Sequence, residues 1–257
     1  MWAGFWFLFF MFLIFPLVVI GSFFGKIRGG NFVYKLLHAW SDFWFFMVGI
    51  HVRTIMEEKP DPNKQYVFVV NHISNLDAAL LVKVIRQPFR PLGKIELKKV
   101  PVFGFIYKVC VVVVDRSNAE NRQQSIRHLK AVIRKGISIL IFPEGNLAKV
   151  GEKFRYRSGV WHMARDFDLP VVPVATNLGL FWPQEAFEKH PGTATLEFLD
   201  PIPPGLPKGT FLARLEAAIE TRTAELVAEV TGRPVIAALQ VPTPEDVRRG
   251  AVTPSEA

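Results

Sequence analysis

The first 25 residues contain no ionisable side chain and consist mostly of aromatic and aliphatic residues. As one helix they would be about 37 Å long, against a bilayer hydrocarbon core of roughly 30 Å. A secretory signal peptide is the alternative, but the segment has no basic start and no small-residue cleavage site, and it exceeds the usual apolar region of such a signal. The sequence therefore predicts a retained membrane anchor, and Pro16 permits a kinked or re-entrant segment as well as one that spans.

A second apolar stretch covers residues 36–48, where large apolar side chains recur at helical spacing opposite polar ones. This pattern predicts an amphipathic helix. Such a helix could belong to a protein core, but its aromatic content and its position after a lipid-seeking segment favour the membrane interface. We therefore predict a membrane-anchoring helical hairpin over residues 1–56, with Gly29 and Gly30 at its turn.

Basic residues closely follow the first apolar segment, at Lys26, Arg28 and Lys35. If that segment spans, the positive-inside rule places the rest of the chain on the cytoplasmic face of the cell inner membrane. The whole chain carries a net charge of +8. Because its basic residues are scattered and no nucleic-acid motif is present, we expect membrane lipid rather than nucleic acid as a partner.

After a polar break at residues 57–65, short apolar strands alternate with helices along the chain. We predict strands at 66–70, 109–114, 137–142, 171–175 and 195–199, and helices at 77–85, 119–134, 158–166 and 211–230. Apolar strands separated by helices indicate an α/β domain over residues 57–235, with a mixed, largely parallel sheet flanked by helices. The polar tail at 236–257 is predicted to be disordered.

The single cysteine, Cys110, lies in an apolar run that we predict to be a strand. A cysteine in such a run is expected to be an inert core residue, and one cysteine cannot form an intrachain disulfide. The six histidines are dispersed, and none is spaced with another histidine or with the cysteine as metal ligands are. We therefore predict no metal and no cofactor.

His72 and Asp77 directly follow the strand predicted at 66–70. On one continuous helix their side chains would lie about 140° apart, too far to share a proton. They can meet if His72 stays in the loop and Asp77 begins the next helix, with Ser74 and Asn75 as turn or N-cap residues. Asp77 would then accept a hydrogen bond from one ring nitrogen and leave the other nitrogen as a general base.

A second polar motif, Phe142-Pro143-Glu144-Gly145, follows the strand predicted at 137–142. Sites in α/β sheets form at the carboxyl ends of strands, and a glycine lets the backbone approach a ligand closely. We therefore expect Glu144 and Gly145 at the same edge of the sheet as His72.

Four motifs occur in a fixed order along the chain. They are Asn71-His72 through Asp77; Gly93-Lys94-Ile95-Glu96-Leu97 with Pro101, Gly104 and Asp115-Arg116; Phe142-Pro143-Glu144-Gly145; and Val172-Pro173-Val174. Over about residues 31 to 232, this chain resembles the bacterial glycerolipid acyltransferases that acylate 1-acyl-glycerol-3-phosphate. The ordered set is specific, whereas any one motif alone is weak.

The resemblance implies an O-acyltransferase of phospholipid biosynthesis that makes phosphatidic acid. His72 would deprotonate the free hydroxyl of a lysophospholipid, which attacks the thioester of acyl-CoA or acyl carrier protein, and Asp77 would orient the imidazole. Glu144 and Gly145 would contact the polar head of the acceptor. Lys94 and Arg116 are the candidates to hold its phosphate.

The chain departs from the family pattern directly after Gly145. The family usually continues with threonine and a phosphate-binding arginine, whereas Asn146 and Leu147 stand here. Basic residues of the following loop that could compensate are Lys149, Lys153, Arg155 and Arg157. Otherwise the acceptor would be another lysolipid with less charge on its head, such as lyso-ornithine lipid.

Two other functional classes are compatible with parts of the sequence. An inactive lipid-binding membrane scaffold is suggested by Asn146 and Leu147, but the intact His72 and Asp77 argue against it. An esterase would require a Gly-x-Ser-x-Gly nucleophile motif, which the sequence lacks. The membrane-bound acyltransferase is therefore the main prediction.

Overall fold

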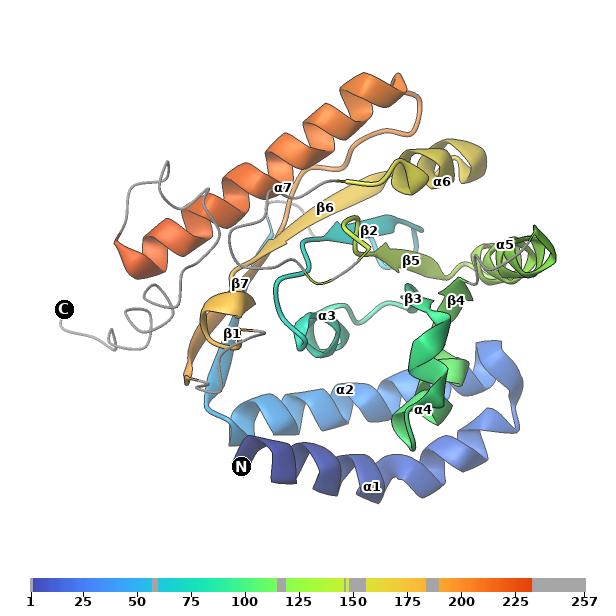
Figure 1. Cartoon of the computed structure of the whole chain (residues 1–257), viewed down its shortest axis with the longest axis vertical. Coiled ribbons are helices and arrows are strands. Elements are labelled where there is room, and N and C mark those ends of the chain that lie inside the picture. Colours follow the sequence, from blue (N-terminus) through green and yellow to red (C-terminus); the bar gives the residue numbers. More distant parts are fainter. Residues whose placement is uncertain are drawn as a thin grey trace. The chain divides into compact units, whose positions relative to one another are not determined.

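The computed structural model describes residues 2–56, 60–114, 119–145, 147, 156–183 and 190–232. The chain divides into two compact units. The hairpin unit comprises Met1–Val48, Pro62–Gln65 and Ala79–Leu140, and the site unit comprises Gly49–Asp61, Tyr66–Ala78 and Ile141–Ala257. Strands and helices alternate along both, which confirms the predicted α/β class (Figure 1).

Four strands build the site unit. Their order is β1 (Ile50–Met56), β7 (Gly192–Phe198), β6 (Val171–Thr176) and β2 (Val67–Val70). The β1–β7 and β2–β6 pairs are parallel, and the β6–β7 pair is antiparallel. All residues of β2 and β6 are buried, which explains why both strands read as continuous apolar runs.

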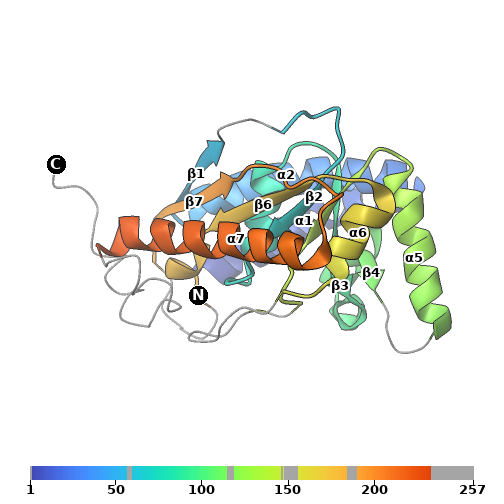
Figure 2. The ribbon, with the colours of Figure 1, turned by 90° about the horizontal axis from the view of Figure 1, so that it is seen from above.

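Two helices cover the strands of the site unit. The helix α6 (Gly159–Phe167) packs against β2, and the long helix α7 (Lys208–Thr231) packs against β6 (Figure 2). Buried apolar residues of α7 repeat at helical spacing, at Phe211, Leu215 and Ile219. This packing keeps the carboxyl ends of β2 and β6 together, and the residues that follow these two strands form the site described below.

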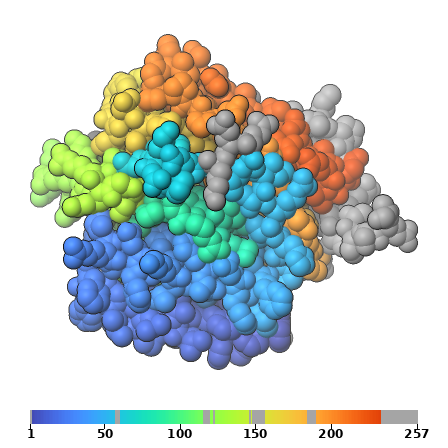
Figure 3. All heavy atoms as spheres, turned by 180° about the vertical axis from the view of Figure 1, so that it is seen from behind, coloured from blue at the N-terminus to red at the C-terminus, as the bar shows by residue number. Residues whose placement is uncertain are grey.

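The hairpin unit begins with two antiparallel helices. They are α1 (Trp2–Ser22) and α2 (Gly30–Met47), joined by a short π-helical turn at Gly25–Gly29. The helices lie side by side and form the blue surface of the space-filling view (Figures 1 and 3). Pro16 lies inside α1, and this helix continues through it.

The rest of the hairpin unit contains three parallel strands with their helices. The strands are β5 (Ser138–Ile141), β3 (Phe89–Lys94) and β4 (Val112–Val114), in that order. The helices are α3 (Asp77–Val84), which starts in the site unit, the 3-10 helix η2 (Ile95–Lys99), α4 (Phe103–Cys110) and α5 (Ala119–Ile133). The predicted mixed, largely parallel sheet is confirmed by these pairings.

The buried Arg90 of β3 forms hydrogen bonds with the turn of the hairpin. Its guanidinium donates hydrogen bonds to the carbonyl oxygens of Lys26 and Ile27 at 3.3 and 3.4 Å, and to Oδ1 of Asn31 at 2.7 Å. It also lies over the ring of Tyr34, 4.9 Å from the centroid. A buried cation with several acceptors holds the backbone that those acceptors belong to.

The hairpin turn is not where the sequence placed it. Gly29 and Gly30 have right-handed helical dihedral angles, whereas Gly25 has φ +76°. A Cβ atom on Gly29 would collide with the carbonyl oxygen of Gly21. The two glycines therefore allow close packing of the backbones, and Gly25 supplies the left-handed conformation that the turn requires.

The apolar run at 109–114, predicted as one strand, is divided between a helix and a strand. Val109 and Cys110 end the helix α4, and only Val112–Val114 form a strand. A short apolar run has the same composition in a buried helix end as in a buried strand, so its pattern does not separate the two. The predicted boundaries at residues 56 and 57 stay predictions, and the tail at 236–257 lies outside the described residues.

Candidate active site

Asn71 fixes the start of the loop that leaves β2. Its buried side-chain amide donates to the carbonyl oxygen of Thr176 and accepts from the backbone N–H of the same residue, both at 3.0 Å. Thr176 ends β6, so the amide joins the two strands where their backbone pairing stops. A buried side chain that satisfies both backbone groups of its neighbour has little freedom to move.

His72 and Asp77 meet as the spacing requires, with His72 in the loop and Asp77 at the first position of α3. The Nδ1 atom of His72 lies 3.0 Å from Oδ2 of Asp77. The same oxygen accepts the backbone N–H groups of Ile73 and Ser74, both at 2.8 Å. One fully buried carboxylate oxygen therefore shapes the loop and orients the imidazole.

The contact with Asp77 is made through Nδ1 of His72 and leaves the other ring nitrogen, Nε2, outside it. Burial raises the pKa of Asp77, and the hydrogen bonds from His72, Ser74 and Ile73 oppose that rise. The ring of His72 is stacked on Phe142, with centroids 4.0 Å apart and planes 18° apart. Its side chain remains 17% exposed, and no described residue forms a hydrogen bond with Nε2. Nε2 is thus available to a ligand.

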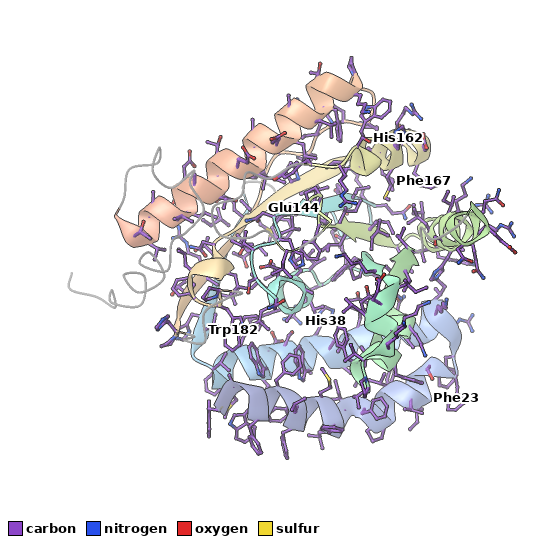
Figure 4. All side chains as sticks on the ribbon, in the orientation of Figure 1. Phe23, His38, Glu144, His162, Phe167 and Trp182 are labelled. Carbon is purple, nitrogen blue, oxygen red and sulfur yellow. The ribbon has the colours of Figure 1, made fainter. Side chains whose placement is uncertain are left out.

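Glu144 lies beside His72, and Figure 4 labels its side chain. Its Oε1 atom accepts the backbone N–H of His72 at 3.1 Å, whereas the buried Oε2 atom has no hydrogen-bond partner among the described residues. Burial raises the pKa of Glu144 to about 7. Gly145 follows with φ +74°, in a turn closed by its N–H to the carbonyl oxygen of Phe142 at 3.1 Å.

Ser74 and Trp182 make a contact that sequence reasoning missed. The Ser74 hydroxyl donates to the carbonyl oxygen of Trp182 at 2.7 Å and accepts the N–H of Leu76 at 3.2 Å. The segment after β6 therefore supports the loop of His72. Ser74 itself stood out as a turn residue, but nothing in the sequence pairs it with a residue 108 positions away.

The structure describes only some of the other predicted site residues. Lys94 ends β3 in the hairpin unit. Arg116, Asn146, Lys149, Lys153 and Arg155 lie outside the described residues. Arg157 is described, is exposed and lies next to Gly145. Among the described residues, no group of three or more His, Cys, Asp and Glu side chains is arranged to hold a metal ion.

Comparison with known proteins identifies the domain that holds this dyad. A protein-family model described as Acyltransferase matches residues 51–177. The chain carries an acyltransferase-family domain. The matched range includes the loop of His72, Glu144 and all of β6, so the dyad lies within the acyltransferase domain.

Two curated relatives of this acyltransferase domain bear the same name. The 1-acyl-sn-glycerol-3-phosphate acyltransferase of Cocos nucifera is 32% identical over 143 residues, which cover 54% of this chain and 46% of the relative. The protein of that name from Pseudomonas aeruginosa is 32% identical over 134 residues, covering 51% and 52%. The matched segments thus span about half the length of these relatives.

A solved structure shares the fold of the acyltransferase domain. The crystal structure of the 1-acyl-sn-glycerophosphate acyltransferase PlsC from Thermotoga maritima superimposes with a TM-score of 0.70. The match covers 88% of this chain and 95% of that protein, at 20% sequence identity. Similarity of this kind establishes the common α/β fold.

Proposed function

We propose that the chain transfers a fatty acyl group from acyl-CoA or acyl carrier protein to the hydroxyl of 1-acyl-glycerol-3-phosphate. The observation that carries this proposal is the contact between His72 and Asp77, with Nε2 of the imidazole free of described partners. The family of the domain and the printed names of its relatives support the reaction class and the acceptor.

The dyad has the geometry for general-base catalysis of a direct transfer. Nε2 of His72 accepts the proton of the acceptor hydroxyl while the hydroxyl oxygen attacks the carbonyl carbon of the thioester. The C–S bond then breaks, and the departing thiolate takes the proton from His72 and leaves as a free thiol. Asp77 holds the Nδ1 proton throughout and stabilises the imidazolium between these steps.

The site residues also suggest how the acceptor is held. Glu144 bonds the backbone of His72 through Oε1 and leaves the buried Oε2 without a described partner. At the pH where its pKa lies, about 7, the carboxyl group can donate or accept a hydrogen bond. We assign it to a second polar group of the acceptor head, beside the hydroxyl that His72 deprotonates.

We further propose that α1 lies within one leaflet rather than across the bilayer. One described helix, α1, is long and apolar enough to cross a membrane. Yet it is fastened to α2 at its start, where the indole N–H groups of Trp2 and Trp44 donate to the carbonyl oxygens of Met47 and Ala3. Towards its end, Phe15 contacts Phe105 of α4, with ring centroids 5.7 Å apart.

The exposed side of the hairpin is strongly apolar. Its exposed large apolar side chains are Trp2, Phe5, Leu8, Phe9, Phe12, Leu13, Leu17, Ile20, Phe23, Phe24, Phe32, Phe43 and Phe46. Exposed apolar side chains in this number on two neighbouring helices are typical of a membrane-binding face. We propose the cytoplasmic face of the inner membrane as its location, where the hairpin would bind the membrane that holds the insoluble acceptor.

Placement of the hairpin is tested with tags at the two ends of the chain, in sealed vesicles that carry the full-length protein. A helix within one leaflet leaves both tags open to an impermeant protease from the same side. Cleavage of the two tags from opposite sides would show instead that α1 spans the bilayer. The double variant Phe12→Ser/Leu13→Ser should reduce vesicle binding, whereas Ile126→Ser, an exposed apolar residue of α5, should not.

The reaction is tested with purified protein in mixed micelles. Labelled acyl-CoA or acyl carrier protein is offered with 1-acyl-glycerol-3-phosphate, lyso-ornithine lipid or other lysolipids, alongside His72→Ala and the control His162→Ala, which changes an exposed histidine of α6. We expect phosphatidic acid from the wild type and the control, and none from His72→Ala. Product from lyso-ornithine lipid alone would change the acceptor. A His72→Ala variant as active as the wild type would refute the mechanism.

A further inference from the structure

The side chain of Arg157 packs against the backbone of Gly145. A Cβ atom built on Gly145 would lie 2.9 Å from Nε and 3.0 Å from Cζ of Arg157. The backbone N–H of Arg157 donates to the carbonyl oxygen of Pro143 at 3.1 Å, which fixes the start of the arginine side chain beside the same turn. The absence of a side chain at Gly145 is therefore what lets the guanidinium approach the site.

The neighbouring residue shows why this arginine faces outward. Tyr156 is buried, and its pKa is raised mainly by burial and then by the charge of the nearby Glu144. Arg157, the next residue, is exposed. Tyr156 thus anchors the segment behind the turn, and Arg157 extends on the open side of Gly145.

No described residue forms an ion pair with Arg157. Two arginines of the site unit are paired: Arg222 with Glu197, Glu225 and Glu229, and the exposed Arg165 with Asp166. The exposed Arg214 likewise has no ion pair among the described residues, but it lies on α7 and does not contact the turn at Gly145. An arginine that is held in place by its backbone, but whose charge is left without a partner, is suited to bind an anionic ligand in a bidentate manner.

A chain of contacts leads from the dyad to this guanidinium. The backbone of His72 is bonded to Oε1 of Glu144, Glu144 precedes Gly145, and Gly145 contacts Arg157. In 1-acyl-glycerol-3-phosphate the carbon that carries the reacting hydroxyl is adjacent to the carbon that carries the phosphate. In the proposed arrangement, an acceptor held at Nε2 of His72 extends its phosphate towards the turn at Gly145.

We propose that Arg157 binds the phosphate of the acceptor head group and makes this chain select a phosphate-bearing lysolipid. The proposal rests on the proposed function, and it assigns to Arg157 the role that Leu147 cannot fill. The same chemistry is offered by the phosphate groups of an acyl-CoA donor. The test below separates these two sources.

The test compares Arg157→Gln, Arg157→Lys and the control Arg214→Gln, which changes an exposed arginine of α7. At saturating acyl-CoA, Arg157→Gln should raise the KM for 1-acyl-glycerol-3-phosphate about 10- to 100-fold with little change in kcat, because a charge-assisted hydrogen bond is lost. Arg157→Lys should lie between that variant and the wild type. The KM for acyl-CoA and the rate with phosphate-free 1-acyl-glycerol should not change.

Two outcomes would overturn the proposal. An unchanged acceptor KM in Arg157→Gln would show that the arginine does not touch the head group, and a rise in the KM for acyl-CoA alone would assign it to the donor. A positive control is Leu147→Arg combined with Arg157→Gln, which should lower the acceptor KM again. Unchanged thermal unfolding of Arg157→Gln would confirm that its fold is intact.

Lipid binding tests Arg157 independently of the proposed reaction. If the wild type transfers acyl groups to no acceptor, the proposed acyl transfer is refuted. The role of Arg157 is then tested by measuring which lipids the protein binds. Micelle-bound wild type should retain 1-acyl-glycerol-3-phosphate more tightly than 1-acyl-glycerol, and Arg157→Gln should lose that preference. Equal retention of both lipids by the wild type would refute the phosphate site.

Discussion

The loop around His72 and the N-terminal hairpin are held together in different ways. In the loop, Oδ2 of Asp77 accepts three hydrogen bonds, and the hydroxyl of Ser74 makes two. In the hairpin, Phe7 contacts Trp40 and Trp44 through ring edges, with centroids 5.0 and 5.9 Å apart. The loop depends on directional bonds, whereas the hairpin depends on contact area.

This difference predicts different tolerance to substitution. A buried polar group loses its partner when the partner is removed, and the unsatisfied group is costly. An apolar side chain that is replaced by another of similar volume keeps most of its contacts. Substitutions should therefore reduce activity or stability strongly around His72 and only weakly between α1 and α2.

Asp77→Asn should have the largest effect. An amide cannot stabilise the imidazolium of His72 by charge, so kcat should fall by about 10³-fold or more. The measurement is steady-state acyl transfer, with circular dichroism to confirm the fold. Asp166→Asn is the control, since Asp166 is exposed and pairs only with its neighbour Arg165 among the described residues. A kcat within a few-fold of the wild-type value would leave Asp77 a structural residue.

Glu144→Gln should remove a pH dependence of stability. Because the pKa of Glu144 is raised from 4.5 to about 7, the folded state binds more protons than the unfolded state between these values. The contribution is complete below pH 4.5 and is lost as the pH rises through about 7, on the order of 3 kcal/mol. Urea unfolding from about pH 4.5 to 8 measures it, and parallel curves for wild type and variant would contradict it.

Ser74→Ala should destabilise the loop by about 2 kcal/mol, because the N–H of Leu76 and the carbonyl oxygen of Trp182 each lose a partner. The matched variant in the hairpin is Ser22→Ala, which removes a single bond to the carbonyl oxygen of Val19 within the same helix. It should change the free energy of unfolding by no more than about 0.5 kcal/mol. Equal losses of unfolding free energy in the two variants would contradict the proposed difference between the two regions.

The same substitution in both regions gives the smallest expected effects. Phe142→Leu removes the ring stacked on His72, and kcat should fall by about 2- to 10-fold. Phe7→Leu should cost less than about 1.5 kcal/mol of stability and leave both kcat and vesicle binding unchanged. A larger loss of activity from Phe7→Leu would mean that the hairpin positions the catalytic loop.

Much of the α/β alternation could be predicted from local patterns. The apolar runs at β2, β5 and β6 are bounded by polar or turn residues, so their periodicity and their length both indicate strands. The strands β1 and β3 and the helix α4 were missed. Arg53 and Thr54 in β1 and Arg90 and Pro91 in β3 interrupt the apolar pattern, and only pairing with β7 and β5 makes these segments strands.

The dyad was predictable because its residues are close in sequence. A histidine and an aspartate five positions apart can meet in only one simple way, and the structure has that arrangement. The place of Arg157 was not predictable, because the sequence offered four basic residues of equal standing in one loop. Of these four, Arg157 is the one that the structure describes, and its contact with the turn at Gly145 is a tertiary one.

The sequence by itself determined the apolar N-terminal segment, the order of the motifs and the local helix and strand pattern, since these depend on composition and short-range periodicity. The tertiary structure alone decided which distant groups meet. Asn71 bonds Thr176 across 105 positions, and Arg90 reaches the turn of the hairpin. Such contacts arise when strands pair and helices pack, and the spacing of residues along the chain carries no information about that pairing.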